Sequence, residues 1–128
     1  MAIPSGSGTE ILTSTYIHQQ SDTASSIRWD GTPATTGTST YVVPDHHIIT
    51  VLSVVITEMA GNAETISMYV NDGSQDIYLL NVESVPANGT FIFSDKFVVK
   101  AGHKVVTLCT PANVDIYVTY IDQDWSLL

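Results

Sequence analysis

Short runs of alternating apolar and polar residues, separated by turn residues, constrain the fold of this chain most. Residues 93–122 hold three such runs, which are separated by Ala101-Gly102 and by residues 111–113. Successive side chains of a β-strand point to opposite faces of the sheet, so this alternation predicts strands with one buried face. No segment shows apolar residues at a spacing of 3.6 over the length of a helix. The sequence therefore predicts an all-β protein.

The same pattern predicts about eight strands over the whole chain. Asp72-Gly73, within residues 71–74, suits the positive φ angles of a tight turn and predicts a hairpin. Short strands at intervals of about 8–12 residues are typical of an antiparallel β-sandwich of jelly-roll or immunoglobulin-like type. The expected strands are residues 10–19, 25–30, 48–59, 64–70, 75–85, 90–95, 96–100, 103–110 and 113–121.

The length of 128 residues is that of one domain. Residues 1–9 are small and polar and predict a flexible N-terminal arm, which leaves residues 10–128 as one sandwich domain. Residues 48–56 are apolar at both even and odd positions, which predicts a strand that is covered on both faces. A neighbouring subunit is one possible cover. The expected core is Ile48, Leu52, Val54, Ile56, Ile66, Met68, Phe91, Phe93, Leu108, Ile116 and Val118.

The charge balance excludes several classes of partner. Thirteen acidic residues against four basic ones give a net charge of −9, whereas phosphate contacts need clustered Lys and Arg.

No apolar run approaches the roughly 20 residues of a membrane span. The N-terminal residues show neither the basic segment nor the apolar core of a signal peptide. We therefore expect no nucleic-acid or membrane partner, and synthesis in the cytoplasm.

Candidate catalytic and metal-binding residues are few. Asp45-His46-His47 is the sharpest polar cluster, but neighbouring strand residues point to opposite faces, so both histidines reach one metal only from a turn. The His-x-His pattern of cupins is not present. Cys109 and His103 are six residues apart on one expected strand, which is roughly 20 Å and too far for a dyad. The sequence predicts a protein that is not an enzyme, with no catalytic residue, cofactor or metal.

The aromatic residues leave a carbohydrate-binding role open. Tyr69 is expected to point outward, where a ring can stack on a sugar, whereas most of the others fit core or interface positions. The residues considered for such a face are Trp29, Tyr41, Tyr69, Tyr78, Tyr117, Tyr120 and Trp125.

Residues 85–122 resemble the second half of small tailed-bacteriophage virion proteins. The upstream segment 46–73, "HHIITVLSVVITEMAGNAETISMYVNDG", is similar to their central hairpin, so the resemblance covers roughly residues 46–122. It does not extend over residues 1–40. The matching residues are Pro86-Ala87-Asn88-Gly89, Val98-Val99-Lys100-Ala101-Gly102-His103, Ala112-Asn113-Val114-Asp115 and Val118-Thr119-Tyr120-Ile121-Asp122.

This resemblance implies a β-sandwich that belongs to a phage particle. The implied role is a capsid decoration, or cement, protein that binds the major capsid protein on the head surface and stabilises the shell. It also implies a homo-oligomer, expected as a trimer, that assembles in the host cytoplasm. The alternative is a phage tail or fibre module that binds a receptor or a carbohydrate. The expected partner contacts are Ile3, Pro4, Trp29, Trp125, Leu127 and Leu128.

Overall fold

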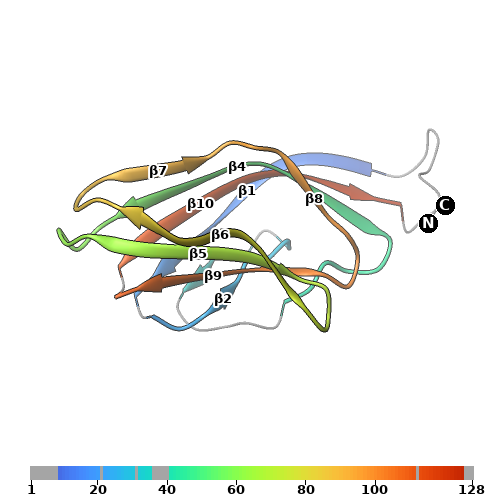
Figure 1. Cartoon of the computed structure of the whole chain (residues 1–128). Helices are drawn as coiled ribbons and strands as arrows, with labels where there is room; N and C mark the ends of the chain where they lie inside the picture. The colour runs from blue at the N-terminus through green and yellow to red at the C-terminus, as the bar shows by residue number, and fades with distance from the viewer. Residues whose placement is uncertain (1–8, 21, 31, 36–40, 112, 126–128) are drawn as a thin grey trace.

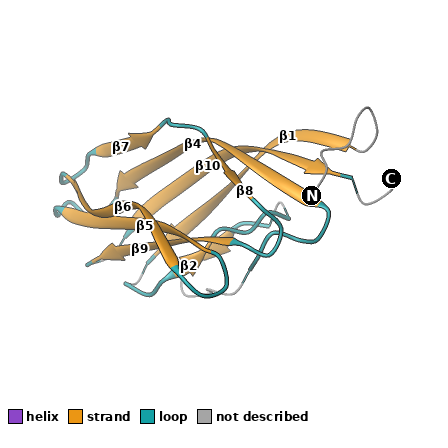
Figure 2. Ribbon diagram, turned by 45° about the vertical axis from the view of Figure 1, so that its right-hand side comes forward, coloured by secondary structure: helices purple, strands orange, loops and turns teal. Residues whose placement is uncertain are grey.

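The computed structural model describes residues 9–20, 22–30, 32–35, 41–111 and 113–125. Figures 1 and 2 show that this part of the chain consists of strands and connecting loops, without a helix. The predicted all-β class is therefore confirmed. The strands are β1 (Thr9–Gln19), β2 (Ser25–Ser26), β3 (Ala34–Thr35), β4 (His47–Glu58), β5 (Glu64–Asn71), β6 (Asp76–Val85), β7 (Thr90–Phe93), β8 (Phe97–Val99), β9 (Lys104–Thr110) and β10 (Val114–Asp124).

The strands form two sheets that pack face to face as the two layers of Figure 1. Sheet A has the order β3-β1-β10-β4-β7, and β8 also pairs with β4; sheet B has the order β2-β9-β5-β6. The pairings are antiparallel, except for a short parallel contact between β1 and β3. The predicted β-sandwich is confirmed.

The strand order distinguishes a jelly roll from an immunoglobulin-like sandwich. We set aside the two-residue β3 and count β7 and β8 as one interrupted strand, because both pair with β4. The sheets then read 1-8-3-6 and 2-7-4-5 in chain order. This is the order of a jelly roll, in which strand pairs 1-8 and 3-6 lie in one sheet and pairs 2-7 and 4-5 in the other.

The β5–β6 hairpin forms where the sequence predicts it. Gly73 has a φ angle of 102°, and a Cβ atom there would have no neighbour within 4 Å, so conformation rather than space favours glycine. The Asp72 carboxylate accepts hydrogen bonds from the backbone N–H groups of Gln75 and Ser74, at 2.8 and 2.9 Å. These two N–H groups lower the pKa of Asp72. The turn is therefore stabilised by its own aspartate.

One irregularity in β4 decides which of its side chains enter the core. Along the β4–β10 ladder, Val54 lies opposite Val118, but Val51 lies opposite Tyr120. Three steps along β4 therefore correspond to two steps along β10. The additional residue falls at Leu52, which makes a β-bulge. A bulge reverses the alternation of side chains, because the period of a strand is two residues.

The bulge changes the interpretation of the long apolar run. Ile49 and Val51 before it, and Val54 and Ile56 after it, are all fully buried in the sandwich core. Leu52 is half-buried on the opposite face. The sandwich core covers one face of β4, and the cover of its other face by a neighbouring subunit stays a prediction. A single face of β4 enters the core along its whole length, and the parity of the inward residues changes at the bulge.

The predicted core residues are buried except where the inward parity or the position of the strand differs from the prediction. Val54, Ile56, Ile66, Met68, Ile116 and Val118 are buried. Phe91 and Phe93 are partly buried and pack against the core from the edge strand β7. Ile48, Leu52 and Leu108 are half-buried and do not belong to the core.

Glu58 is a buried carboxylate at the end of β4 that joins two turns. Its Oε1 accepts a hydrogen bond from the N–H of Ala60 at 2.7 Å, and its Oε2 accepts from Gly61 and Asn88 at 2.9 and 2.8 Å. Burial by itself would raise the pKa of Glu58, but these N–H groups and that of Asn62 hold it below its ordinary value. The charge of Glu58 is therefore satisfied by the backbone.

We expect Glu58→Gln to be less stable than the wild type at pH 7, because a glutamine NH₂ group faces backbone donors. A lowered folded-state pKa contributes stability above the unfolded value of about 4.3, and this contribution is lost as the pH falls toward the folded value. The difference in unfolding free energy between the two proteins should therefore shrink as the pH falls below about 4.3. Urea unfolding at a series of pH values measures it. A difference that stays constant with pH would contradict an ionised Glu58.

Candidate functional site

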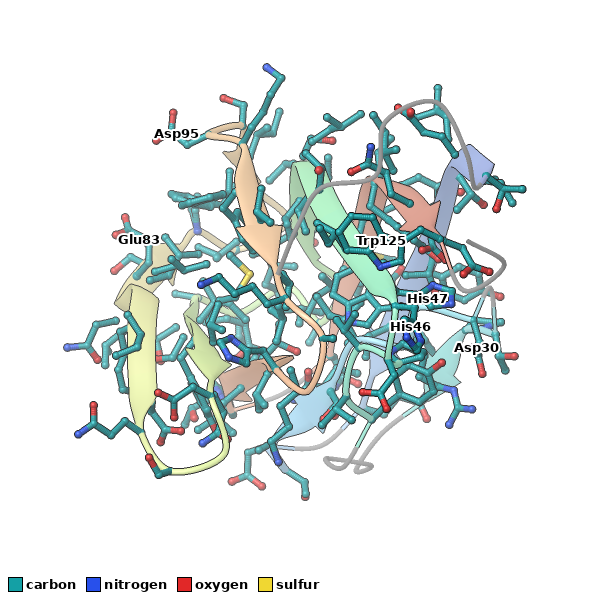
Figure 3. All side chains as sticks on the ribbon, turned by 90° about the vertical axis from the view of Figure 1, so that its right-hand side faces the viewer. Asp30, His46, His47, Glu83, Asp95 and Trp125 are labelled. Carbon is teal, nitrogen blue, oxygen red and sulfur yellow. The ribbon has the colours of Figure 1, made fainter. Side chains whose placement is uncertain are left out.

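His47 lies between two carboxylates where β4 begins and β10 ends. Its Nδ1 is 2.8 Å from Oδ1 of Asp122, and its Nε2 is 3.5 Å from Oδ1 of Asp124. On the same end of the sandwich, the N–H of Trp125 donates a hydrogen bond to the carbonyl of His46 at 3.1 Å. The end-on view of Figure 3 shows His46, His47 and Trp125 together. These contacts attach the end of β10 to the start of β4.

A small pocket of about 230 Å³ opens beside the contact between His47 and Asp122. Within it, the rings of Trp29 and Tyr120 meet edge to face, with centroids 4.9 Å apart and planes at 78°. Both side chains are buried, Trp29 to 3% exposure, so neither presents a flat face on which a sugar ring can stack. The pocket is lined by Ile11, Thr13, Trp29, Asp30, Tyr120 and Asp122.

The acidic groups of the pocket already have partners. Arg28 donates a hydrogen bond to Asp30 at 2.9 Å, and its guanidinium lies 4.9 Å from the centroid of the Tyr41 ring. Burial would raise the pKa of Asp30, but the hydrogen bonds from Arg28 and from the N–H of Thr32 lower it below its ordinary value. Asp122 is held by His47. We interpret this end of the sandwich as a structural polar cluster.

The sequence cluster Asp45-His46-His47 is not arranged around a common point. His46 is exposed and has a φ angle of 67°, whereas the ring of His47 is engaged by the two aspartates of β10. Glu58 is likewise engaged, since backbone N–H groups surround its carboxylate. Within the described residues, no group of three or more His, Cys, Asp or Glu side chains could hold a metal ion.

Cys109 is buried in the core on β9, as its apolar surroundings predict. Burial, with a further effect of the nearby Glu64 carboxylate, raises the pKa of its thiol to about 11. Its thiolate form is therefore scarce at neutral pH, which makes it a poor nucleophile.

The expected partner-contact residues divide into two groups. Ile3, Pro4, Leu127 and Leu128 lie outside the described residues. Trp29 and Trp125 are described, and their exposed fractions are only 3% and 7%. In the single chain, neither indole ring is therefore exposed enough to contact a partner.

The candidate surface that sequence reasoning missed is the outer face of sheet A. In the sheet, Tyr16 of β1 lies opposite Tyr117 of β10, Tyr117 opposite Val55 of β4, and Val55 opposite Ile92 of β7. Residues directly opposite each other point to the same face. Because Ile17 and Ile116 are buried in the core, Tyr16 and Tyr117 point outward. These four side chains form a first apolar row across the sheet.

A second row crosses the same face nearer the start of β1. Leu12 lies opposite Ile121, Ile121 opposite Thr50, and Thr50 opposite Val98 of β8. Leu12 is 68% exposed, although it is a large apolar residue in a strand. Alternation along a single strand carries no signal that outward side chains of separate strands align into rows.

The outer face of sheet A is also uncharged between its ends. The row that separates the two apolar rows consists of Ser14, Thr119 and Ser53. The ion pair between His18 and Asp115 bounds the face at one end, and Glu10 at the other. On a chain with a net charge of −9, an uncharged apolar sheet face of this extent is typical of a protein–protein contact.

Sheet B presents a smaller aromatic feature. The rings of Tyr69 and Tyr78 lie next to each other, with centroids 5.0 Å apart. Tyr78 is 51% exposed, and Tyr69 is half-buried on the outward side of β5, as the alternation predicted. Among the described residues considered for a sugar-binding face, this pair and Tyr117 are the aromatic side chains that reach the surface of the two outer faces.

Comparison of the chain with protein-family models, with curated proteins and with solved structures finds no match. Within the described residues, no helix is long and apolar enough to cross a membrane.

Proposed function

We propose that this protein is a structural component of a phage particle, and that it decorates the capsid and stabilises the head shell by binding the major capsid protein. The observation that carries this proposal is the uncharged apolar outer face of sheet A. The resemblance of residues 46–122 to small virion proteins gives the proposal its particular partner. The jelly roll is compatible with this role, but lectins and cupins use it too, so the fold alone does not select the function.

The outer face of sheet A fits a binding role because its apolar groups stand on a rigid support. The rows cross the strands of a hydrogen-bonded sheet whose opposite face packs on the core, so the face needs no ordering before it binds. Burying apolar area contributes roughly 25 cal/mol per Å². Each copy therefore contributes a modest contact, and many copies on one shell add their contributions.

The phage tail or fibre module that binds a receptor or carbohydrate is the second candidate. The Tyr69–Tyr78 pair on sheet B favours it, because two adjacent rings, one exposed and one half-buried, offer a stacking surface. This surface and the outer face of sheet A are on opposite layers of the sandwich. The two functions are therefore separable by mutation.

A pair of matched variants tests the proposal on bare phage heads. Tyr117 and Tyr78 are exposed to 48% and 51%, so Tyr117→Asp and Tyr78→Asp each place one charge on a comparable surface position of sheet A or sheet B. We expect wild type and Tyr78→Asp to bind heads and to raise their resistance to heat, and Tyr117→Asp to bind at least tenfold more weakly, since a desolvated charge opposes burial. Sedimentation of heads with labelled protein measures binding.

The copy number per particle and a glycan-binding assay complete the test. A decoration protein is expected in hundreds of copies per head, whereas a tail or fibre protein is expected in a few copies per particle. If the wild type ignores bare heads but binds glycans or host cells, and Tyr78→Asp abolishes that binding, the tail module is the correct function and the decoration proposal fails.

A further inference from the structure

Strand β1 has an open edge over most of its length. Residues 9–19 pair with β10 on one side. On the other side, among the described residues, only Ile17 and His18 pair with β3. Residues 9–14 therefore present a row of backbone groups that no described strand covers, whereas Thr15 is buried and its hydroxyl donates to the carbonyl of Thr32. The exposed side chains of Ile11 and Leu12 lie on this edge. An open edge of this kind is a template for another strand.

The other edges of the sandwich are protected by their geometry. In sheet A, the opposite edge is divided between β7 and β8, which have four and three residues. In sheet B, the edge strand β6 carries register shifts opposite β5, and Val82 has a φ angle of 54°, unusual for a β-branched residue. The N–H of Val82 is bound by the Ser67 hydroxyl at 2.9 Å. Short strands and bulges prevent edge pairing, and β1 has neither device.

The charge distribution favours a second copy of this chain as the occupant. Two chains of net charge −9 repel each other, and they approach most easily where neither carries charge. Residues 9–16, "TEILTSTY", contain one charged group, Glu10, and the neighbouring rows of sheet A are uncharged. In an antiparallel pair of identical strands, the two Glu10 side chains meet only if the two-fold axis passes through Glu10. A register centred on residues 12–14 keeps them apart.

We infer that two copies of this protein pair through their β1 edges, antiparallel, to form a two-fold dimer with one continuous sheet. The seam joins the outer faces of the two sheets A, so the uncharged outer face of one copy continues into that of the other. Identical edges that pair about a two-fold axis close into a dimer. This differs from the trimer implied by the resemblance, and it does not depend on the proposed function.

The first experiment compares one substitution on two edges. Leu12→Lys on β1 places a lysine on the open edge, and Ile77→Lys, at a position 53% exposed on β6, is the matched control. Sedimentation equilibrium of the wild type and of Ile77→Lys is expected to give twice the chain mass of 13.8 kDa. Leu12→Lys is expected to raise the dimer dissociation constant at least tenfold. Circular dichroism checks that both variants stay folded.

The second experiment locates the two-fold axis. Single cysteines are introduced at each position from 10 to 16, and the protein is oxidised; the native Cys109 is buried and serves as an internal blank. Directly opposed residues of antiparallel strands have Cα atoms about 4.5–5.5 Å apart, within the reach of a disulfide. A cysteine near the axis faces its own copy, so we expect cross-linked dimer to peak at one position between 12 and 14.

Each outcome separates this inference from the proposed function. A monomer or a trimer, or the absence of any cross-linking position, would overturn the β1 pairing and leave head binding unaffected. A dimer of the expected symmetry that ignores bare heads would support the pairing and overturn the decoration role.

Discussion

Replacing Ile49 with alanine is expected to lower the free energy of unfolding by about 2–5 kcal/mol. Ile49 is completely buried on the inner face of β4, on the N-terminal side of the bulge. The substitution removes buried methyl and methylene groups and leaves a cavity that the surrounding sheet fills only in part. Urea unfolding of the wild type and the variant, followed by circular dichroism, measures the change.

Leu52→Ala is the matched control for this prediction. It removes the same number of carbon atoms, but Leu52 is half-buried at the bulge on the outer face. Its loss of stability is therefore expected to be well below that of Ile49→Ala. If Leu52→Ala proved the more destabilising of the two, then β4 would run without the bulge, with the parity that the sequence pattern predicts.

Trp29→Ala is expected to lower the free energy of unfolding by about 3–5 kcal/mol. The indole ring is almost fully buried and packs edge to face on Tyr120. A pair of this kind contributes about 0.5–1.5 kcal/mol beyond the area that it buries. Chemical unfolding followed by far-UV circular dichroism measures the loss, because the variant lacks one of the two tryptophans as a fluorescent probe.

Trp29→Phe distinguishes the contribution of ring packing to stability from that of the indole N–H group. The indole Nε1–H is buried without a hydrogen-bond partner among the described residues. Phenylalanine keeps an aromatic ring next to Tyr120 and removes this unpaired donor, so its loss of stability should be clearly smaller than that of alanine. If phenylalanine and alanine were equally destabilising, the N–H group would have a partner, or the full width of the indole would be essential.

The strand positions were largely predictable because alternation is a local property. The predicted strand 64–70 compares with β5 at Glu64–Asn71, and 103–110 with β9 at Lys104–Thr110. The β5–β6 turn was predictable for the same reason, since Asp72 and Gly73 form it with their own backbone. The expected strand over 25–30 is shorter in the structure, where β2 contains only Ser25 and Ser26. Its pairing with β9 ends after two residues.

The candidate surface was much less predictable than the strands. Outward parity of Tyr16 and Tyr117 follows from each strand alone, but their alignment into one row requires the register between β1 and β10, which are about a hundred residues apart. The aromatic residues Trp29 and Trp125, considered as contacts because of their type, are buried. Residue type does not reveal whether the rest of the fold covers a side chain.

The sequence by itself determined the all-β class, the hairpin at residues 71–74 and the acidic charge, because each depends on neighbouring residues or on composition alone. Only the tertiary structure decided the jelly-roll order, the bulge at Leu52 and the open edge of β1. These depend on which backbone groups of distant strands meet. A shift of one residue in that pairing exchanges the inner and outer faces of a strand. The core, the outer face of sheet A and the β1 edge therefore exist only once β10 lies between β1 and β4.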